Sequence, residues 1–354
     1  MNIVRVLNFL EDKDKPQVIL FYDKKLEKFL DEMDYPYMEK VPWEFLPVYQ
    51  GFVRSFILRR NVFISDMIDE YNIDVLFPNS NFPVKNRSGT RVISWYADLQ
   101  HKYYPEFFNK RKTIERNLRI RFSLRNGTDL IVSSNAVKDD FMRFYKVPAS
   151  LRIHVYHFVS VIEKFPKNDI ARLLSKYNLP EKYFLISNQF HKHKNHSTAF
   201  RALAELKNSG KNIHFAVTGK LPEQPTSKYM QELREIISSY DLKDNISFLG
   251  LISRGDQLLI MKYAQAIIQP SLFEGWSTVI EDARSLQVPV IASNLPVNKE
   301  QLKDKGEFFE PHNYTHLAEI ICSFPKRDLN QKIYEEYEVR IKKAAYELLK
   351  IFKN

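Results

Sequence analysis

Apolar runs of strand length alternate with amphipathic stretches along most of the chain. In the second half, apolar runs occur at residues 183–187, 213–219, 246–250, 266–271, 289–293 and 307–310. In the first half they occur at residues 17–22, 73–78, 91–96 and 129–134. Helical spacing separates many of them, as in residues 197–210, where Gly210 provides a C-terminal stop. This alternation predicts βα units built on parallel sheets.

A chain of 354 residues exceeds one ordinary core, so we expect two doubly wound α/β domains of Rossmann-like type. Residues 163–182 contain Pro166 and Pro180 and have little strand character, which places the boundary there. The predicted domains are residues 1–165 and 166–330. The carboxyl edges of their strands are expected to face a shared cleft. Residues 331–354 are predicted to end in a helix that packs back across the domains.

The first domain begins unusually. Ile3, Val6, Leu7 and Leu10 have helical spacing, whereas a doubly wound sheet usually opens with a strand. We therefore expect the first domain to lack its opening strand and the turn after it. One hypothesis is that the chain begins at an internal start relative to its relatives, with weakened or absent activity.

Composition narrows the class of protein. A hydrophobic content of 44% with 14% aromatic residues is typical of a folded domain. The single cysteine, Cys322, allows no internal disulfide and suits a reducing cytosol. A net charge of +10 indicates an anionic partner, which leaves nucleic acid, an acidic membrane face and a phosphorylated substrate open. We expect a cytoplasmic location.

Several common motifs are absent from the sequence. The nine glycines are not spaced as a dinucleotide-binding fingerprint or a Walker loop, which argues against a dehydrogenase or a P-loop NTPase. The sequence has neither a nucleophile elbow nor a Cys/His zinc spacing. We therefore expect neither a metal nor a resident cofactor.

The stretch from residue 266 to residue 287 predicts a strand, a loop and a helix. Gly275 allows a close approach, and the amides of residues 276–279 are expected to be unpaired at the helix start, which favours a diphosphate. Glu281 could accept hydrogen bonds from a ribose diol, and Glu274 from the hydroxyls of a second sugar. A plain interpretation stays open, since Thr278 and Glu281 fit a capping box and Glu274 fits a solvated loop.

A second polar turn follows the predicted strand at residues 183–187. It contains Lys192 and Lys194, whose charges could neutralise a leaving diphosphate. The histidines at 191, 193 and 196 also suggest a metal site, although the adjacent lysines would repel a cation. A basic turn without a ligand is the other alternative.

These motifs have a counterpart among known families. Residues 270–293, 188–196 and 248–253 resemble the donor domain of family 4 retaining glycosyltransferases, which have the GT-B fold. Residues 95–108 and 129–145 resemble the acceptor domain of a bacterial subgroup associated with lipopolysaccharide O-antigen or capsule assembly. The resemblance extends from about residue 16 onward. It implies a metal-independent, hexosyltransferase-type enzyme that moves a sugar, with retention, from a nucleoside-diphosphate-sugar to a hydroxyl acceptor.

The resemblance also assigns roles to residues. It implies that Glu274 contacts the donor sugar, Glu281 the ribose and Lys194 the diphosphate. Further donor contacts are implied for Gln189, Lys192, Leu251, Ile252, Gly275, Trp276, Ser277 and Thr278. Leu251 and Ile252 would lie near the base, and Lys192 could replace an arginine that the family usually has where Gln189 stands.

Two departures from the family pattern affect these assignments. Six residues, Gly275 to Ile280, separate the two glutamates where the family usually has seven. On the acceptor side, Ala97 and Asp98 stand where many members have a His-Asp pair. His101 lies three residues beyond Asp98 and is the candidate catalytic histidine on that side, with a plain loop residue as the alternative.

Residues 102–125 carry eight Lys and Arg residues against two glutamates, with aromatic residues before the basic run. This stretch could rest on anionic lipid at the inner face of the plasma membrane and meet a lipid-linked or oligosaccharide acceptor. A solvated helix face is the alternative. Three other functions stay open: another GT-B enzyme such as a sugar-nucleotide epimerase, an inactive shortened paralogue, and a basic nucleic-acid-binding protein. No nucleic-acid module is recognisable, so nucleic acid is not the expected partner.

Overall fold

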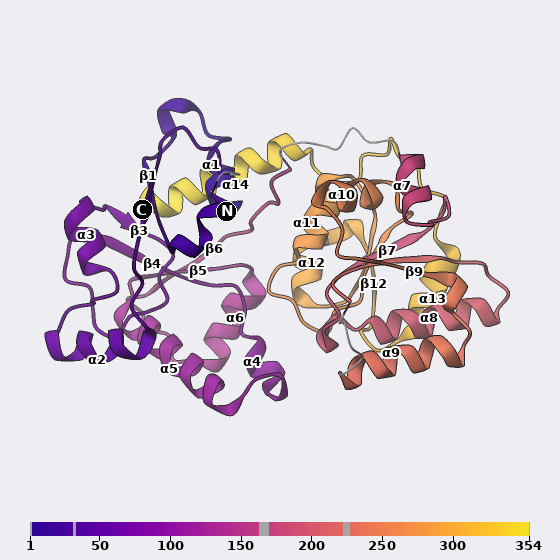
Figure 1. Ribbon diagram of the computed structural model, residues 1–354, viewed down its shortest axis with the longest axis horizontal. Coiled ribbons are helices and arrows are strands. Elements are labelled where there is room, and N and C mark those ends of the chain that lie inside the picture. The colour runs from indigo at the N-terminus through magenta and orange to yellow at the C-terminus, as the bar shows by residue number, and fades with distance from the viewer. Residues whose placement is uncertain (1, 31–32, 163–169, 222–226, 354) are drawn as a thin grey trace. The chain divides into compact units, whose positions relative to one another are not determined.

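The computed structural model describes residues 2–30, 33–162, 170–221 and 227–353 (Figure 1). The chain forms two compact units. Unit 1 comprises the residues up to Val161 together with those from Glu338 onward, and unit 2 comprises Ile162–Tyr337. The boundary predicted at residues 165–166 lies outside the described residues. Unit 2 extends beyond the predicted end at residue 330, and the last helix is grouped with unit 1.

Unit 2 is built on a six-stranded parallel sheet with the order β12-β11-β10-β7-β8-β9. Its strands are β7 (Phe184–Ser187), β8 (Phe215–Thr218), β9 (Ile246–Gly250), β10 (Ile267–Gln269), β11 (Val290–Ser293) and β12 (Gly306–Phe309). All six lie where the apolar runs predict strands. The chain starts at the central strand β7, builds outward to β9, and returns to the centre at β10, which is the order of a doubly wound fold.

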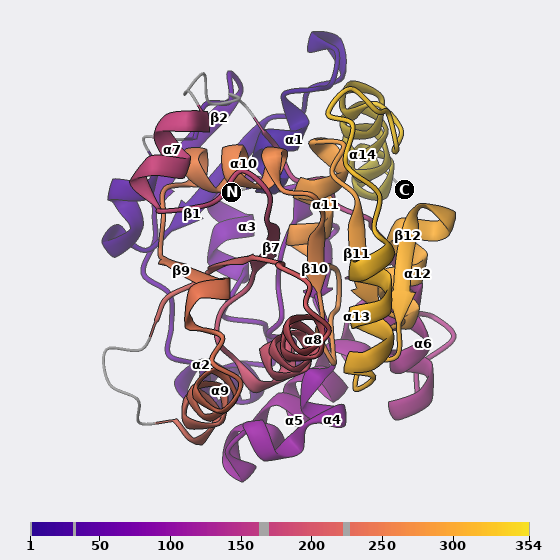
Figure 2. The same ribbon diagram turned by 90° about the vertical axis from the view of Figure 1, so that its right-hand side faces the viewer.

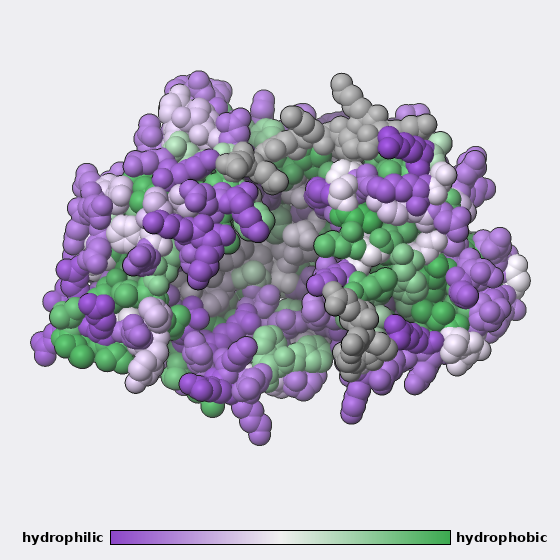
Figure 3. Space-filling view, in the orientation of Figure 1, coloured by the Kyte–Doolittle hydropathy of each residue, from purple (hydrophilic) through white to green (hydrophobic). Residues whose placement is uncertain are grey.

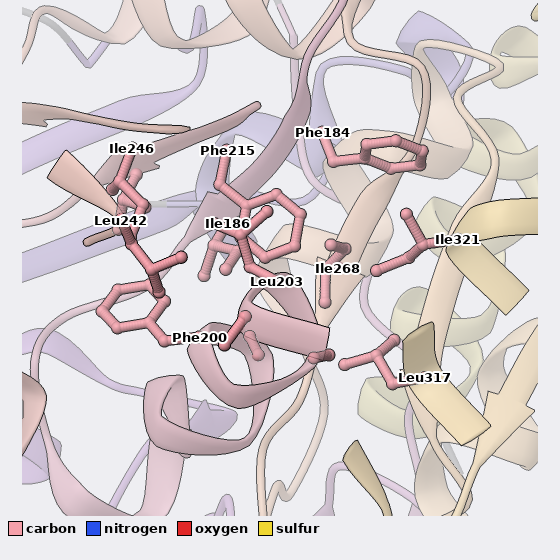
Figure 4. Close-up of a cluster of buried hydrophobic side chains, with 14 of the residues drawn as sticks. Phe184, Ile186, Phe200, Leu203, Phe215, Leu242, Ile246, Ile268, Leu317 and Ile321 are labelled. Atoms are coloured by element: carbon pink, nitrogen blue, oxygen red, sulfur yellow. The ribbon is translucent and has the colours of Figure 1, made fainter. Parts of the chain in front are cut away.

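Helices cover both faces of this sheet (Figure 2). One face carries α8 (His196–Asn208), α9 (Lys228–Ser239) and α13 (Tyr314–Ser323). The other carries α7 (Ile170–Lys176), α10 (Arg254–Tyr263) and α11 (Thr278–Ser285). The remaining elements are α12 (Pro296–Leu302), η4 (Lys192–Lys194), η5 (Lys243–Asn245) and η6 (Lys303–Lys305). Phe200 and Leu203 of α8 pack against Ile186 and Phe215 of the sheet, which gives unit 2 its own core (Figure 4).

Unit 1 contains two parallel sheets. The larger has the order β3-β4-β5-β6, and the smaller pairs β1 with β2. The strands are β1 (Val18–Tyr22), β2 (Met38–Pro42), β3 (Val75–Leu76), β4 (Arg91–Tyr96), β5 (Asp129–Val132) and β6 (Arg152–Val155). The described part of unit 1 starts with α1 (Asn2–Leu7), which buries Val6 and Leu7, and its strand nearest in sequence is β1.

The other helices of unit 1 pack on these sheets. They are α2 (Val48–Leu58), α3 (Ser65–Tyr71), α4 (Gln100–Tyr103), α5 (Lys110–Asn126), α6 (Asn135–Phe144), α14 (Tyr337–Lys353) and the short η1 (Asp12–Asp14), η2 (Lys24–Phe29) and η3 (Pro105–Phe107). Ile120 of α5 and Phe141 of α6 meet Leu130 and Val132 of β5 in one cluster. Among the described helices, none combines the length and the apolar character that spanning a bilayer requires.

A buried acid connects the larger sheet of unit 1 to the C-terminal helix. Asp129 is fully buried and accepts hydrogen bonds from Arg91 at 2.8 and 3.1 Å, Arg152 at 3.0 Å and His154 at 2.7 Å. Arg91 also donates to the carbonyls of Ile351 and Phe352 at the end of α14. Burial alone would raise the pKa of Asp129, but these donors hold it well below its usual range.

Replacing Asp129 with asparagine should destabilise unit 1 by about 3 kcal/mol, since buried or partly buried cations would lose their counter-charge. Urea unfolding of the full chain measures this change. Asp241→Asn is the control, because Asp241 pairs with Lys207 at an exposed site. Equal stability of the two variants would show that the Asp129 network does not hold unit 1 together.

Two histidines are buried as neutral groups. His196, at the start of α8, stacks on Phe190 with 4.7 Å between ring centroids. Burial, aided by the charge of Lys194, lowers the pKa of His196 to about 3. Burial, aided by Arg116, lowers the pKa of His101 to about 4. Because unfolded histidine binds its proton near pH 6.5, stability is fully present above that pH and falls as the pH decreases toward these values.

His196→Phe should flatten part of this pH dependence. Between pH 6.5 and 5 the wild-type chain should lose about 2 kcal/mol of stability through His196, a range in which ordinary carboxylates change little. Urea unfolding at several pH values from 5 to 8 measures the slope. An unchanged slope in the variant would contradict the assignment of this proton to His196.

Candidate functional site

The polar residues predicted to bind the donor gather where the strand order of unit 2 reverses, between β7 and β10. The turn after β7 and the loop after β10 are tied together by backbone and side-chain bonds. The Leu272 amide donates to the carbonyl of His193 at 2.7 Å. Asn195, in the left-handed region with φ 54°, donates from its side chain to the carbonyls of Pro270 and Pro311 at 3.0 and 2.7 Å. The two connections therefore form one structured surface.

Lys194 and Glu274 meet at this surface. The Lys194 ammonium lies 2.6 Å from Oε1 of Glu274. The same oxygen accepts from Gln269 at 2.8 Å, and Gln269 accepts from Asn188 at 2.9 Å. The Lys194 side chain is 19% exposed and that of Glu274 is 9% exposed, so the pair lies just beneath the surface. The structure thus brings together two of the three residues predicted to be catalytic.

Sequence reasoning missed Asn188 and Gln269, which fix the orientation of Glu274. Both are buried at the carboxyl ends of apolar strands. A polar side chain at the end of a buried strand needs a hydrogen-bond partner there. The polar residues that end these two apolar runs could therefore have indicated a hydrogen-bonded site in the sequence.

The start of α11 differs from the prediction. Ser277 is the N-cap residue, and its hydroxyl accepts from the Ile280 amide at 3.3 Å. The Ser277 amide donates to the Gln301 side chain at 3.2 Å, and that side chain donates back to the Ser277 carbonyl at 2.9 Å. The expectation that all amides of residues 276–279 are unpaired is therefore wrong for Ser277. The side-chain cap comes from Ser277 rather than Thr278, which is exposed.

Glu281 lies inside unit 2, against α12. Its side chain is fully buried, and Oε1 accepts from Arg284 at 2.6 Å and from Gln301 at 2.8 Å. Because Gln301 also holds both backbone groups of Ser277, Glu281 helps to fix the start of α11.

The next residue, Asp282, faces a different neighbour. Its two oxygens accept from Arg254 of α10 at 2.5 and 2.6 Å. Helix α10 follows directly on the turn that contains Leu251 and Ile252, the predicted base contacts. Seven residues, Gly275 to Glu281, separate Glu274 from Asp282. Sequence reasoning missed Asp282, although the seven-residue spacing was the signal.

The other predicted donor contacts lie around the same edge of the sheet. Gln189 is exposed and accepts from the Lys220 amide at 3.0 Å. Leu251 is exposed, whereas Ile252 is half-buried against the core. Gly219 has φ +142°, and a Cβ there would lie 2.3 Å from the Asn188 carbonyl, so only glycine allows this approach.

The two lysines of the basic turn point to different places. Lys194 meets Glu274, whereas Lys192 lines a cavity of about 360 Å³ together with Arg201 of α8 and Tyr229 of α9. The rings of His191 and His193 stack on each other at 5.6 Å, while His196 is in the core. Across the described ranges, no three His, Cys, Asp or Glu side chains are grouped so that they could hold a metal ion.

In unit 1, His101 is buried in α4. Its Nε2 lies 3.2 Å from the Tyr145 hydroxyl and 3.3 Å from Oδ1 of Asn117. Asp98 is half-buried, accepts from the Gln100 amide at 3.0 Å, and pairs with Arg116 at 3.2 Å. Both predicted acceptor-side residues therefore help to hold the start of α4 in place.

Sequence comparison gives partial matches to two curated bacterial proteins. The chain is 30% identical over 185 residues to "Protein CapJ" of Staphylococcus aureus, covering 51% of this chain and 42% of CapJ. It is 26% identical over 215 residues to "O-antigen chain mannosyltransferase RfbU" of Salmonella typhimurium, covering 60% of this chain and 55% of RfbU. The chain therefore spans about half the length of the curated relatives that it matches.

Solved structures share the fold of nearly the whole chain. A glycosyltransferase from Rickettsia africae is similar with a TM-score of 0.63 and 17% identity, covering 99% of this chain and 91% of the other. Anabaena Alr3699/HepE in complex with UDP gives a TM-score of 0.65 and 17% identity over the same shares. At such identities the likeness shows the fold alone, which is the predicted GT-B type.

The family described as "Glycosyl transferases group 1" matches residues 170–347, half of the chain, and this match includes the Lys194–Glu274 pair and both acids of α11. The resemblance seen in the sequence is thereby confirmed, and the chain belongs to the glycosyl transferases group 1 family.

Proposed function

We propose that this protein is a retaining glycosyltransferase that moves a sugar from a nucleoside-diphosphate-sugar to a hydroxyl acceptor. One observation carries the proposal: Lys194 and Glu274 meet at 2.6 Å where the strand order of a parallel sheet reverses. Ligands of doubly wound sheets bind at this reversal, outside the carboxyl ends of the strands. One similar structure contains UDP and glucose, which is in keeping with such a donor.

Each group at the reversal has a chemical task. The Lys194 ammonium and the positive end of α11 stabilise the diphosphate as charge develops on it. Glu274 accepts hydrogen bonds from hydroxyls of the donor sugar. Gly275, Trp276 and Thr278 approach the diphosphate and sugar at the start of α11.

The transfer needs no protein nucleophile. The bond between the anomeric carbon and the diphosphate oxygen breaks while the acceptor oxygen bonds to the same face of that carbon. The acceptor proton passes to the departing phosphate oxygen. Positioning and charge stabilisation are then the contributions of the protein, without a metal or a resident cofactor.

The ribose has two candidate carboxylates. The sequence interpretation chose Glu281, whose side chain is bonded to Arg284 and to Gln301 of α12. Both acids are buried, with side chains 0% and 4% exposed, so their partners and their spacing from Glu274 distinguish them. Asp282 has the seven-residue spacing from Glu274 and is joined by Arg254 to the helix that follows Leu251 and Ile252. We therefore assign the ribose hydroxyls to Asp282 and a supporting role to Glu281. Leu251 and Ile252 contact the base.

The remaining assignments concern the phosphates and the acceptor side. Gln189 and Lys192 lie at the edge of the phosphate site, with Lys192 supplying charge where relatives use an arginine. Asp98 and His101 position the acceptor side by shaping α4. Because His101 is buried, we assign it to positioning and not to proton transfer.

The acceptor is a lipid-linked or oligosaccharide hydroxyl in O-antigen or capsule assembly at the inner face of the plasma membrane. The name of RfbU, an O-antigen chain mannosyltransferase, favours this substrate class. The cations of residues 102–125 would face anionic lipid there.

Lys194→Gln tests the phosphate assignment. Glutamine can keep a hydrogen bond to Glu274 but removes the charge, so nucleoside diphosphate should bind at least tenfold more weakly, about 1.4 kcal/mol. Thermal shifts with UDP-, GDP- and ADP-sugars first identify the base, and calorimetric titration then gives the dissociation constant. Lys211→Ala, beyond the far end of α8, is the control. Unchanged affinity in Lys194→Gln would remove Lys194 from the site.

A ribose analogue separates the two acids of α11. Asp282→Asn should weaken binding of the nucleoside diphosphate about tenfold, because the carboxylate that binds the ribose hydroxyls is removed. Binding of the 2′,3′-dideoxy analogue should stay nearly unchanged, because the analogue has no hydroxyls for that carboxylate to bind. Glu281→Gln should lower the melting temperature without changing that ratio. If Glu281→Gln altered the ratio and Asp282→Asn did not, the ribose would belong to Glu281.

A further inference from the structure

Unit 1 exposes a large apolar surface on two helices, which we call the α2–α5 face (Figures 1 and 3). Its exposed apolar residues are Phe45, Tyr49, Val53, Phe56, Ile57 and Leu58 from α2 and the segment before it, and Ile114 and Leu118 from α5. Tyr49 is 81% exposed, Ile57 74% and Ile114 62%. Contiguous apolar surface of this kind commonly marks an interaction site.

The α2–α5 face is held in place by residues beneath it. Phe122 of α5 packs against Phe52 and Phe56 of α2, with ring centroids 5.6 and 5.8 Å apart. On the inner side of α2, a Cβ at Gly51 would lie 2.1 Å from the Phe63 ring, so the helix approaches that ring as closely as glycine allows. The outermost residues Tyr49 and Ile57 are therefore not needed to fix α2 on unit 1.

Positive charge surrounds the apolar residues. Helix α2 itself has no acidic residue, and Arg54 and Arg59 are exposed on it or directly after it. Arg60 is also exposed but pairs with Asp66, and Glu44 is exposed in the segment before α2. Helix α5 carries one acid, Glu115, and seven basic residues. The exposed basic residues of α5 are Lys110, Arg111, Lys112, Arg121 and Arg125.

The combination of aliphatic side chains and cations distinguishes between partners. Nucleic acid would use the cations but would gain little from Ile57, Leu58 or Ile114. A second copy of the chain would bring like charges together, which is unfavourable. An anionic bilayer satisfies both, because its headgroups pair with the cations and its acyl boundary accepts the apolar side chains.

We propose that the α2–α5 face binds an anionic bilayer, with the outer residues of α2 entering the boundary between headgroups and acyl chains. The inference deepens the proposed function and rests on it for its purpose, since a lipid-linked acceptor would be met at this surface. The proposed function places only the cations of residues 102–125 against lipid, and the present inference adds the exposed apolar residues of α2 as a second membrane contact.

Flotation with vesicles tests the proposal on the full chain. Wild type should float with vesicles of phosphatidylcholine and phosphatidylglycerol, and at least fivefold less with phosphatidylcholine alone or at high salt. Ile57→Glu should reduce flotation with the anionic vesicles at least fivefold. Leu329→Glu is the matched control, because Leu329 is also exposed but lies in unit 2. Arg121→Glu should reduce flotation without changing the apolar residues.

Several results would overturn the proposal. They are a wild-type protein that does not float, an Ile57→Glu variant that floats as well as wild type, a wild-type dimer that Ile57→Glu dissociates, and wild-type binding to RNA but not to vesicles. Nucleoside diphosphate binding to Ile57→Glu is measured in parallel and should equal that of wild type. Wild-type protein that binds nucleotide but does not float would overturn the membrane surface alone. Wild-type protein that floats but binds no nucleotide would overturn the transferase proposal and leave the bilayer contact standing.

Discussion

Unit 2 depends on one topological constraint, the reversal of strand order between β7 and β10. Strands β7 and β10 are neighbours in the sheet, yet the helices that follow them cover opposite faces. Their connections therefore diverge at the carboxyl edge and leave polar side chains side by side. Lys194 comes from one connection and Glu274 from the other, 80 residues later in the chain. Their pairing is a consequence of the winding of the sheet.

Buried polar groups then give this edge its precision. Asn188, Gln269, Glu274 and Lys194 form one chain of hydrogen bonds that runs from strand ends into both connections. Such a chain is costly to leave incomplete, so it favours a single arrangement of the loop. Two successive acids of α11 connect this edge to the neighbouring helices. Glu281 accepts a hydrogen bond from Gln301 of α12, and Asp282 accepts one from Arg254 of α10.

The sequence was most informative where local pattern and global fold agree. The six strands of unit 2 are apolar runs, and each appears where expected; β7, β8, β10 and β11 are fully buried. Strands β2 and β6 were missed because they carry charged residues, such as Glu39 and Arg152, that mask the alternation. Both Lys194 and Glu274 were expected in connections that follow apolar strands, but neither their contact with each other nor the burial of His101 and Glu281 was predicted. Burial depends on which neighbouring element a helix face packs against. Successive residues of a helix point about 100° apart, so the sequence alone does not show which of two adjacent side chains faces the core.

Unit 1 is discontinuous, since α14 belongs to it although unit 2 intervenes in the chain. The Arg91 guanidinium, fixed by Asp129, donates to the carbonyls of Ile351 and Phe352, which are synthesised after all of unit 2. Unit 2 can therefore assemble on the nascent chain while unit 1 still lacks its closing helix. Premature termination near residue 337 would leave that half of the molecule unfinished even though every one of its strands had already been translated.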